Sequence, residues 1–263
     1  MKIPILDFGY LEFVEAWGSD ERIIEAARMS TGKGFLGWNR LIRCTVCQRE
    51  WECENKPAVC TQSPCLNSPT VEVHPGDQKL LRFLWENKHH TPFEMPGLTV
   101  EAQAPIMVFR EWHRHRVPFG YNEMSARYTP LPDVNYIPSV ERLMIGSDGK
   151  NKQAGTISGA AVLTQQMAEK FQAGLREVYA DAQLLYEEAL AAGVPKELAR
   201  VHLPVGRYSR MRATSNLRGW IGFLVLRMAP SAQYEIRQYA NAIHDVLVER
   251  FPRTMALFDE GRK

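Results

Sequence analysis

The chain has 263 residues, of which 45% are hydrophobic and 24% are charged, and its formal net charge is +2 at pH 7. These values are typical of a globular protein of one large or two small domains. The even charge balance excludes a strongly basic nucleic-acid-binding protein and an acidic disordered chain, because both need a large charge excess. Any anion-binding site must therefore be a local cluster of cations.

No apolar run approaches the roughly 20 residues that a membrane-spanning helix needs. The residues from Met1 to Asp7 also lack the continuous apolar segment of a signal peptide. We therefore expect a cytoplasmic protein that does not bind membranes. All five cysteines fall between Cys44 and Cys65 and would be reduced in that compartment. This grouping indicates a local device and not a chain-wide disulfide framework.

The N-terminal residues have the pattern of two strands and a helix. Apolar and polar side chains alternate around a central turn in Lys2–Trp17, which predicts two short strands. A helix should follow, with Ser19 or Asp20 as its cap and Gly32 with Gly34 at its end. Its apolar side is formed by Ile23, Ile24, Ala27 and Met29.

Periodicity disappears from Gly34 to about Gly76, where Cys, Pro, Asn, Thr and Ser dominate. We interpret residues 36–76 as a Cys-rich insertion within a single domain that comprises residues 1–263. The insertion is expected to be irregular and to be stabilised by a local crosslink of its own.

The helical pattern resumes at Asp77, and proline stops this second helix before Phe93. The apolar residues at helical spacing are Leu80, Leu81, Leu84 and Trp85. A strand is predicted next, because Leu98–Ala104 alternates between apolar and polar side chains.

Helices dominate the predicted remainder of the chain. Pro105 suits a first helical position and opens a helix over Ile106–Arg116, whereas Tyr121–Tyr128 has no assignable pattern. A loop at Gly146–Asn151 precedes a long amphipathic helix over Gln165–Ala192. Three further helices are predicted at Lys196–Leu203, Asn216–Met228 and Gln233–Arg250. The helix at Asn216–Met228 is apolar on most faces and should be buried. The fold class predicted for the chain is α+β, with a small sheet and a large helical share.

The densest polar cluster covers Arg110–Arg116 and continues to Tyr128. As a helix, the first part would present cations on two faces and could bind two anionic groups at once. Ser125 and Arg127 add a hydroxyl and a planar fork that suit a phosphate. From composition alone, a solvated basic face paired with nearby glutamates explains the cluster equally well. The face shared at helical spacing consists of Arg110, His113 and Arg114.

A second cluster contains the arginines Arg200, Arg207, Arg210, Arg212, Arg218 and Arg227. Arg227 differs from the others because it lies in the apolar run Ile221–Met228, where it should be buried. A buried Arg cannot lose its proton, so it requires an anionic or strongly accepting partner. This partner is either a carboxylate such as Glu235 or a ligand that becomes anionic during a reaction.

The triplet Arg114-His115-Arg116, followed by Ser125 and the pair Arg127-Tyr128, resembles the signature of the flavin-dependent thymidylate synthases. The similarity covers most of the chain outside Gly34–Gly76. Because several separated motifs occur in the same order, it favours a functional site over a solvated basic face. The other segments that resemble the family are Met1–Ser30, His89–Glu94 and Arg200–Tyr239.

The resemblance implies an α+β fold with a small antiparallel sheet and a large helical portion. It also implies a homotetramer whose active sites are each built from more than one subunit. The implied reaction converts dUMP to dTMP, with FAD as hydride carrier between NADPH and the methylene group of methylenetetrahydrofolate. The grouping of all cysteines away from the arginine clusters agrees independently with chemistry that uses a cofactor and no Cys nucleophile.

The resemblance assigns roles to individual residues. The flavin cofactor would be contacted by Ser30, His89, Thr91, Arg114, His115, Arg116, Glu123 and Asn216. The nucleotide and its phosphate would be held by Glu111, Arg114, Glu123, Ser125, the backbone of Ala126, Arg127, Arg200 and Arg227. Among these, Arg227 would have the catalytic role of promoting ionisation at uracil N3, so that C5 becomes nucleophilic.

The chain departs from the family pattern at three places. The first departure is the spacing between Arg116 and Ser125, which is eight residues, Val117–Met124, where seven are commoner in the family. The second concerns two substitutions. Gly222 stands where the family usually has a polar residue, and Ser231 stands where it often has His. We therefore expect a reshaped turn beside the ligands and weaker flavin binding. The enlarged turn also keeps two alternatives open, methylation of UMP and hydroxymethylation of a pyrimidine nucleotide, because a single contact can discriminate one hydroxyl.

The third departure is the insertion, whose cysteines form a C-x2-C and a C-x4-C pair with Cys53 as a spare. Two such pairs can supply the four ligands of a tetrahedral structural zinc site. The alternatives are free thiols and disulfides. A zinc ribbon that binds nucleic acid through the arginines would explain neither a buried Arg227 nor the ordered motifs. The predicted zinc ligands are Cys44, Cys47, Cys60 and Cys65.

Four other residues are interpreted without a role in catalysis. His90 and His113 are expected at the surface or partly buried, and Trp112 and Trp220 in the core, because their segments are apolar.

Overall fold

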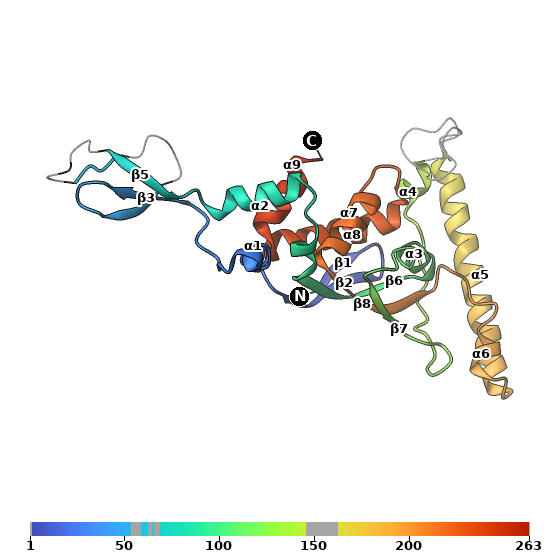
Figure 1. The fold of residues 1–263 in the computed structure, drawn as a ribbon. Coiled ribbons are helices and arrows are strands. Elements are labelled where there is room, and N and C mark those ends of the chain that lie inside the picture. The colour runs from blue at the N-terminus through green and yellow to red at the C-terminus, as the bar shows by residue number, and fades with distance from the viewer. Residues whose placement is uncertain (1, 54–58, 63–64, 66–68, 146–162, 263) are drawn as a thin grey trace. The chain divides into compact units, whose positions relative to one another are not determined.

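A computed structural model describes residues 2–53, 59–62, 65, 69–145 and 163–262 (Figure 1). The chain forms two compact units. The sheet unit contains Met1–Ala16 and Gly97–Leu247, and the insertion unit contains Trp17–Pro96 and Val248–Lys263. The loop predicted at Gly146–Asn151 lies outside the described residues. Among the described residues, no helix has the length and apolarity that crossing a bilayer requires.

The sheet unit is built on a five-stranded sheet with the order β1-β2-β6-β8-β7 (Figure 1). The longest pairing joins β6 and β8, antiparallel from Gly97 opposite Asn216 to Pro105 opposite Tyr208. The predicted N-terminal hairpin and the predicted strand at Leu98–Ala104 are confirmed. The strands are β1 (Lys2–Ile5), β2 (Gly9–Trp17), β6 (Gly97–Pro105), β7 (Gly120–Glu123) and β8 (Tyr208–Asn216).

Strands β7 and β8 are not predicted by the sequence pattern, although β8 lies between β6 and β7 in the sheet. The alternation of β8 is visible in retrospect, since Met211 and Ala213 are buried while Arg210 and Arg212 are exposed. The arginines concealed this pattern, because they suggested a ligand-binding cluster and not the outer face of a strand.

The helices of the sheet unit agree with most predictions. The long helix α5 and the helix predicted at Gln233–Arg250 are confirmed, but the helix expected over Lys196–Leu203 ends already at Ala199. They are α3 (Ile106–Trp112), α4 (Val140–Met144), α5 (Gln165–Ala191), α6 (Lys196–Ala199), α7 (Leu217–Arg227) and α8 (Tyr234–Arg250), whose last residues belong to the insertion unit.

An aromatic core fills the sheet unit. Trp112 and Trp220 are fully buried, as predicted, with ring centroids 6.5 Å apart, and Phe223 packs against both. The expectation that α7 is buried on most faces is wrong, because the side chains of Val225 and Leu226 are 54% and 59% exposed. An apolar run does not show which of its faces has a partner.

The insertion unit contains helices and a second, three-stranded sheet of order β4-β3-β5. The expectation that the insertion is irregular is therefore wrong. Its strands are short and carry charged side chains such as Arg43 and Glu50. They therefore lack the clear alternation of apolar and polar residues by which a strand is recognised in a sequence. The elements are α1 (Asp20–Arg28), η1 (Met29–Thr31), β3 (Arg40–Cys44), β4 (Glu50–Cys53), β5 (Thr70–His74), α2 (Asp77–Glu86), η2 (Thr91–Glu94) and α9 (Pro252–Glu260).

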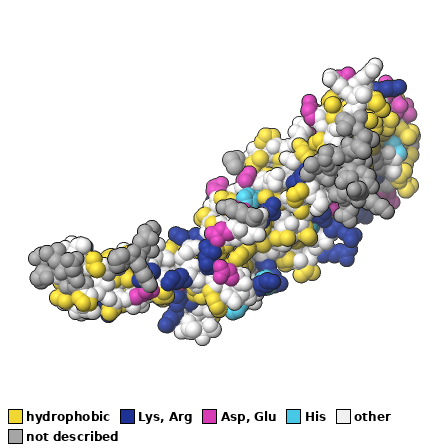
Figure 2. All heavy atoms as spheres, turned by 90° about the horizontal axis from the view of Figure 1, so that it is seen from above, with side chains coloured by type: hydrophobic (Ala, Val, Ile, Leu, Met, Phe, Trp, Pro, Cys, Tyr) yellow, Lys and Arg dark blue, Asp and Glu magenta, His cyan; other side chains and the backbone are white. Residues whose placement is uncertain are grey.

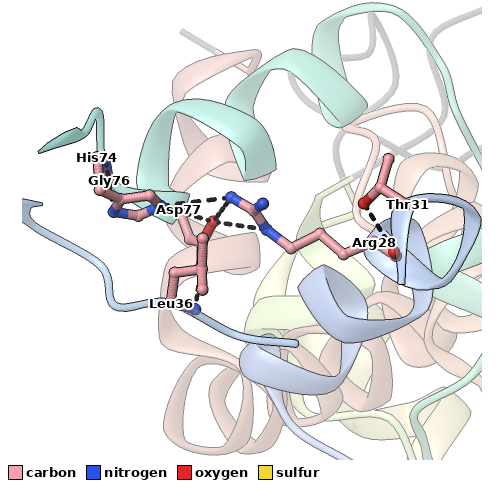
Figure 3. A network of polar contacts seen from close by, with 6 residues as sticks. All are labelled: Arg28, Thr31, Leu36, His74, Gly76 and Asp77. Atoms are coloured by element: carbon pink, nitrogen blue, oxygen red, sulfur yellow. Dashed lines mark hydrogen bonds and ion pairs between the residues drawn. The ribbon is translucent and has the colours of Figure 1, made fainter. Parts of the chain in front are cut away.

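Two buried aspartates hold the helices of the insertion unit together. Asp20 was a candidate cap for α1, but its carboxylate accepts bonds at the start of α9, from the Arg253 N–H at 2.8 Å and the Thr254 hydroxyl at 2.6 Å. Asp77 is fully buried and accepts from Arg28 Nε at 3.0 Å and from the Leu36 N–H at 2.8 Å (Figure 3). Asp77 therefore connects α1 and α2 to the start of the insertion.

Candidate active site

The sheet unit has a cleft of about 520 Å³ beside the end of α7, which is within the size range of small-molecule sites. Its walls come from α3 and the residues that follow it, from the last turn of α7, and from the connection between α7 and α8. The lining residues are Glu111, Arg114, Leu226, Arg227, Ser231, Ala232 and Gln233.

Arg227 is held in this cleft by hydrogen bonds to two residues. Its Nη1 donates to the Glu111 carboxylate at 2.7 Å and its Nη2 to the Glu111 backbone carbonyl at 2.8 Å. Its Nε donates to His115 Nε2 at 2.9 Å. The Arg227 side chain is 16% exposed, so the guanidinium is a fixed cation at the wall of the cleft.

The carboxylate partner proposed for Arg227 from the sequence was wrong. Glu235 instead accepts from Arg142 Nε at 2.8 Å and from the Tyr136 hydroxyl at 3.1 Å. The most buried arginine of the second cluster is also a different one, since Arg207 is 1% exposed and donates to Asp133 at 2.8 Å. Hydropathy along the chain cannot predict these pairs, because the partners lie on different elements.

His115 is neutral in this arrangement. Burial, and then the positive charge of Arg227, lower the pKa of His115 from 6.5 to about 4. The neutral ring can therefore use Nε2 as the acceptor for Arg227 at neutral pH. The backbone next to this ring is also held, because the Tyr121 hydroxyl donates to the His115 carbonyl at 2.6 Å.

The free energy of unfolding of the sheet unit should fall as the pH decreases from 6.5 to about 4. The folded state binds fewer protons than the unfolded state in this window, because the pKa of His115 is lowered by folding. Urea denaturation across the window, compared between the wild type and His115→Gln, isolates this contribution. The wild type should lose more stability than the variant, and two parallel profiles would contradict the prediction.

The predicted helix over Ile106–Arg116 ends earlier than expected, at Trp112. The Tyr121 hydroxyl contacts the carbonyl oxygens of both Trp112 and His115, which favours a turn at this point. The helical face expected for the cation cluster is therefore wrong. Arg114 and Arg116 are exposed instead, on either side of the half-buried His115.

The second half of the signature follows β7. Glu123 is half-buried at the end of that strand, and Ala126 is 2% exposed. The Ser125 hydroxyl accepts from the Arg127 N–H at 3.3 Å, and the exposed Arg127 guanidinium lies 5.4 Å from the centre of the Tyr128 ring. A backbone N–H, a hydroxyl and an exposed guanidinium thus occur within three consecutive residues.

The unusual turn Val117–Met124 packs onto the start of α7. The Phe119 ring stacks on Tyr121 and meets Trp220 edge-on at 4.8 Å. Gly219 permits the approach of Pro118, because a Cβ at Gly219 would lie 2.8 Å from the Pro118 ring. Asn216 caps α7 at this point and accepts from the Gly219 N–H at 2.9 Å.

The other predicted flavin contacts belong to the insertion unit. Ser30 is exposed in η1 and Thr91 is exposed at the start of η2, and α1 packs against η2. His89 is also exposed, and its ring lies edge-on to Phe83 at 5.5 Å. The predicted site residues are therefore divided between the two units.

Three further positions are Arg200, Gly222 and Gln233. Arg200 follows α6 and does not line the cleft beside Arg227. A side chain at Gly222 would meet nothing within 4 Å, so that glycine leaves open space. Gln233 lines the cleft but was not predicted, because a single Gln at the start of a helix carries no distinguishing signal.

Residues 12–253 match the family described as thymidylate synthase complementing protein. A flavin-dependent thymidylate synthase from Thermus thermophilus is 34% identical over 260 residues, which are 99% of this chain and 79% of that protein. One from Thermotoga neapolitana is 33% identical over 258 residues, which are 98% of this chain and 94% of the relative.

A solved structure has the same fold. The UMP/dUMP methylase PolB from Streptomyces cacaoi, bound with 5-Br dUMP, has a TM-score of 0.71 and 26% identity over 98% of this chain and 97% of its own. With 5-Br UMP the TM-score is 0.72 at 23% identity, over 98% of this chain and 96% of that one.

The fold and the matches define an α+β methyltransferase that works with a flavin. The chain belongs to the thymidylate synthase complementing protein family, that of the flavin-dependent thymidylate synthases. The resemblance found in the sequence is thereby confirmed.

Proposed function

We propose that this protein methylates C5 of dUMP to give dTMP, with FAD as cofactor, NADPH as reductant and methylenetetrahydrofolate as carbon donor. The observation that carries the proposal is the Arg227 guanidinium, fixed by Glu111 and His115 at the wall of a cleft large enough for a nucleotide base. The names of the relatives support the same reaction.

Arg227 can donate to a ligand without giving up its supports. Each Nη atom carries two N–H groups, and the bonds to Glu111 use one on each. The second N–H of each would donate to the uracil ring and stabilise the negative charge left when N3 loses its proton. Neutral His115 adds no further positive charge beside the Arg227 guanidinium.

The reaction must proceed without a thiolate in the sheet unit. All five cysteines fall within Cys44–Cys65 of the insertion unit, and none is among the described residues that line the Arg227 cleft. FAD, when bound, supplies the hydride that a Cys-based route obtains in another way.

The predicted donor set suits a dinucleotide cofactor. Arg114 and Arg116 are exposed cations that would bind the pyrophosphate of FAD. The proposed contacts from the His115 ring and the Asn216 amide belong to the same unit as these arginines. Hydroxyls, a carboxylate and an imidazole complete the proposed contacts, at Ser30, Thr91, Glu123 and His89.

The nucleotide phosphate is proposed to bind at the turn after β7. Ser125 supplies a hydroxyl, Ala126 a backbone N–H and Arg127 an exposed guanidinium, with Arg200 as a further cation. Glu111 and Glu123 would orient the base and sugar as hydrogen-bond acceptors. The exposed Arg127 guanidinium can turn toward a phosphate, because its contacts among the described residues are with the neighbouring Tyr128.

UMP is the second candidate substrate. PolB, which shares the fold, is named as a methylase of both UMP and dUMP, and the turn Val117–Met124 is longer than the commoner family spacing. A ribose 2′-hydroxyl needs only a small change of one contact to be accepted.

Initial rates with dUMP, UMP and dCMP, each with methylenetetrahydrofolate, NADPH and added FAD, test the proposal. We expect a flavin absorption spectrum and the highest kcat/KM with dUMP, with dTMP as the product. Faster turnover of UMP would establish the second candidate. Flavin-loaded protein that converts none of these nucleotides would overturn the proposed reaction.

We also propose a homotetramer with shared active sites. Helix α5 supports it, because only Ala168 and Tyr186 of its residues are buried in the single chain. A row of exposed apolar side chains along one helix is typical of a surface that another protein covers. The exposed apolar residues of α5 include Met167, Phe171, Val178, Leu184 and Leu185.

A further inference from the structure

Four of the five cysteines converge at one end of the insertion. Cys44 is the last residue of β3, and Cys47 lies in the turn between β3 and β4. Cys60 and Cys65 come from the segment between β4 and β5, and the four sulfur atoms all lie within 4.8 Å of one another. Because the two pairs come from different parts of the insertion, folding and not sequence proximity brings them together.

The sulfur positions suit a metal ion better than disulfides. A Zn–S bond of about 2.3 Å gives an S–S edge of about 3.8 Å in a regular tetrahedron. The Sγ atoms of Cys47 and Cys60 are 3.9 Å apart. A disulfide would need about 2.05 Å between two of the sulfurs, and it would leave no reason for four of them to gather.

The first cysteine pair lies on a turn that points a backbone N–H group at a sulfur atom. The Val46 N–H points at Cys44 Sγ at 3.4 Å, and the turn is closed by the bond from the Cys44 N–H to the Arg49 carbonyl at 2.9 Å. Gln48 accommodates the turn with a φ of 59°. This end of the cluster is thus prepared for a metal ligand.

The cysteines are also the main buried part of the insertion. Its described buried cluster consists of Cys44, Cys60 and Cys65, with Trp51 packed against it. The valines remain largely at the surface, and hydrophobic side chains are visible on the insertion at the left of Figure 2. A module this small, whose described residues form no larger apolar core, needs a crosslink or a metal to fold stably. The exposed valines are Val46, Val59, Val71 and Val73.

We propose that the insertion binds one Zn²⁺ through Cys44, Cys47, Cys60 and Cys65, in a closed structural site. Four thiolates fill the tetrahedral coordination of the ion and leave no position for water or substrate, so the site has no catalytic role. Zinc binding supplies free energy that folds the insertion. The proposal does not depend on which nucleotide the enzyme methylates.

The first experiment measures the metal content of the full-length protein, purified without chelators, by inductively coupled plasma mass spectrometry. We expect one zinc ion per chain in the wild type and a large loss in Cys47→Ser, because Cys47 is exposed and its change does not disturb packing. Cys53→Ser is the matched control and should keep its zinc, since Cys53 lies on β4 outside the group of four. Equal zinc in all three proteins, or none in the wild type, would overturn the proposal.

A second measurement reports on geometry and does not depend on activity. Protein reconstituted with Co²⁺ should show the visible bands of a tetrahedral thiolate site in the wild type and in Cys53→Ser, and lose them in Cys47→Ser. Iron in place of zinc in the native protein would overturn the assignment of the metal. Limited proteolysis should cut Cys47→Ser faster within 36–76 than the wild type, and equal rates would contradict a structural role.

Discussion

Arg227→Ala should lower the turnover of dUMP by about 10²–10³-fold, the scale on which loss of one donor to a developing negative charge acts. The variant keeps the proposed phosphate contacts at Ser125 and Arg127, so nucleotide binding should be partly retained. The loss should therefore appear mainly in kcat and less in KM. Steady-state kinetics of the flavin-loaded enzyme with dUMP measure both constants.

Arg227→Lys is the matched variant for this test. Lysine keeps a positive charge but lacks the planar fork that bonds Glu111 at two atoms, so it should recover only part of the turnover. The melting temperatures of both variants show whether the sheet unit is still folded. Unchanged kcat in a folded Arg227→Ala protein would refute the ionising role.

Asp77→Ala should lower the free energy of unfolding of the insertion unit by about 3–5 kcal/mol, the range for breaking a buried ion pair by removing one partner. The change leaves the Arg28 guanidinium, whose side chain is only 16% exposed, and the Leu36 N–H without their acceptor. Figure 3 shows that both bonds converge on the Asp77 carboxylate. Urea denaturation followed by circular dichroism measures the loss.

Glu86→Ala is the control on the same helix. Its ion pair with Arg82 is exposed on both sides, at 44% and 59%, so its loss should cost only about 0.2–1 kcal/mol. Asp77→Asn keeps an acceptor for the Leu36 N–H but loses the charge, and should lie between the two. Equal stability of the Asp77 and Glu86 alanine variants would contradict the stabilising role of Asp77.

Local patterns were predicted well where an element has its own periodicity. The helix α1 is defined by Ile23 and Ile24, and both are fully buried. The strand β8 and the strands of the insertion were missed, because charged side chains on their outward faces conceal the alternation. For β8, the partner strand β6 is more than a hundred residues earlier, as in the pair of Thr214 with Thr99.

The sequence by itself determined the family, through motifs whose residues stand next to one another, and it grouped the cysteines in one segment. The tertiary structure alone decided which groups meet. Arg227 reaches Glu111 and His115 across 116 and 112 residues, and the predicted partner Glu235 bonds Arg142 instead. The reason is physical, because a charged side chain pairs with whichever partner the packing of helices and strands brings within hydrogen-bond distance, and the chain order does not contain that distance.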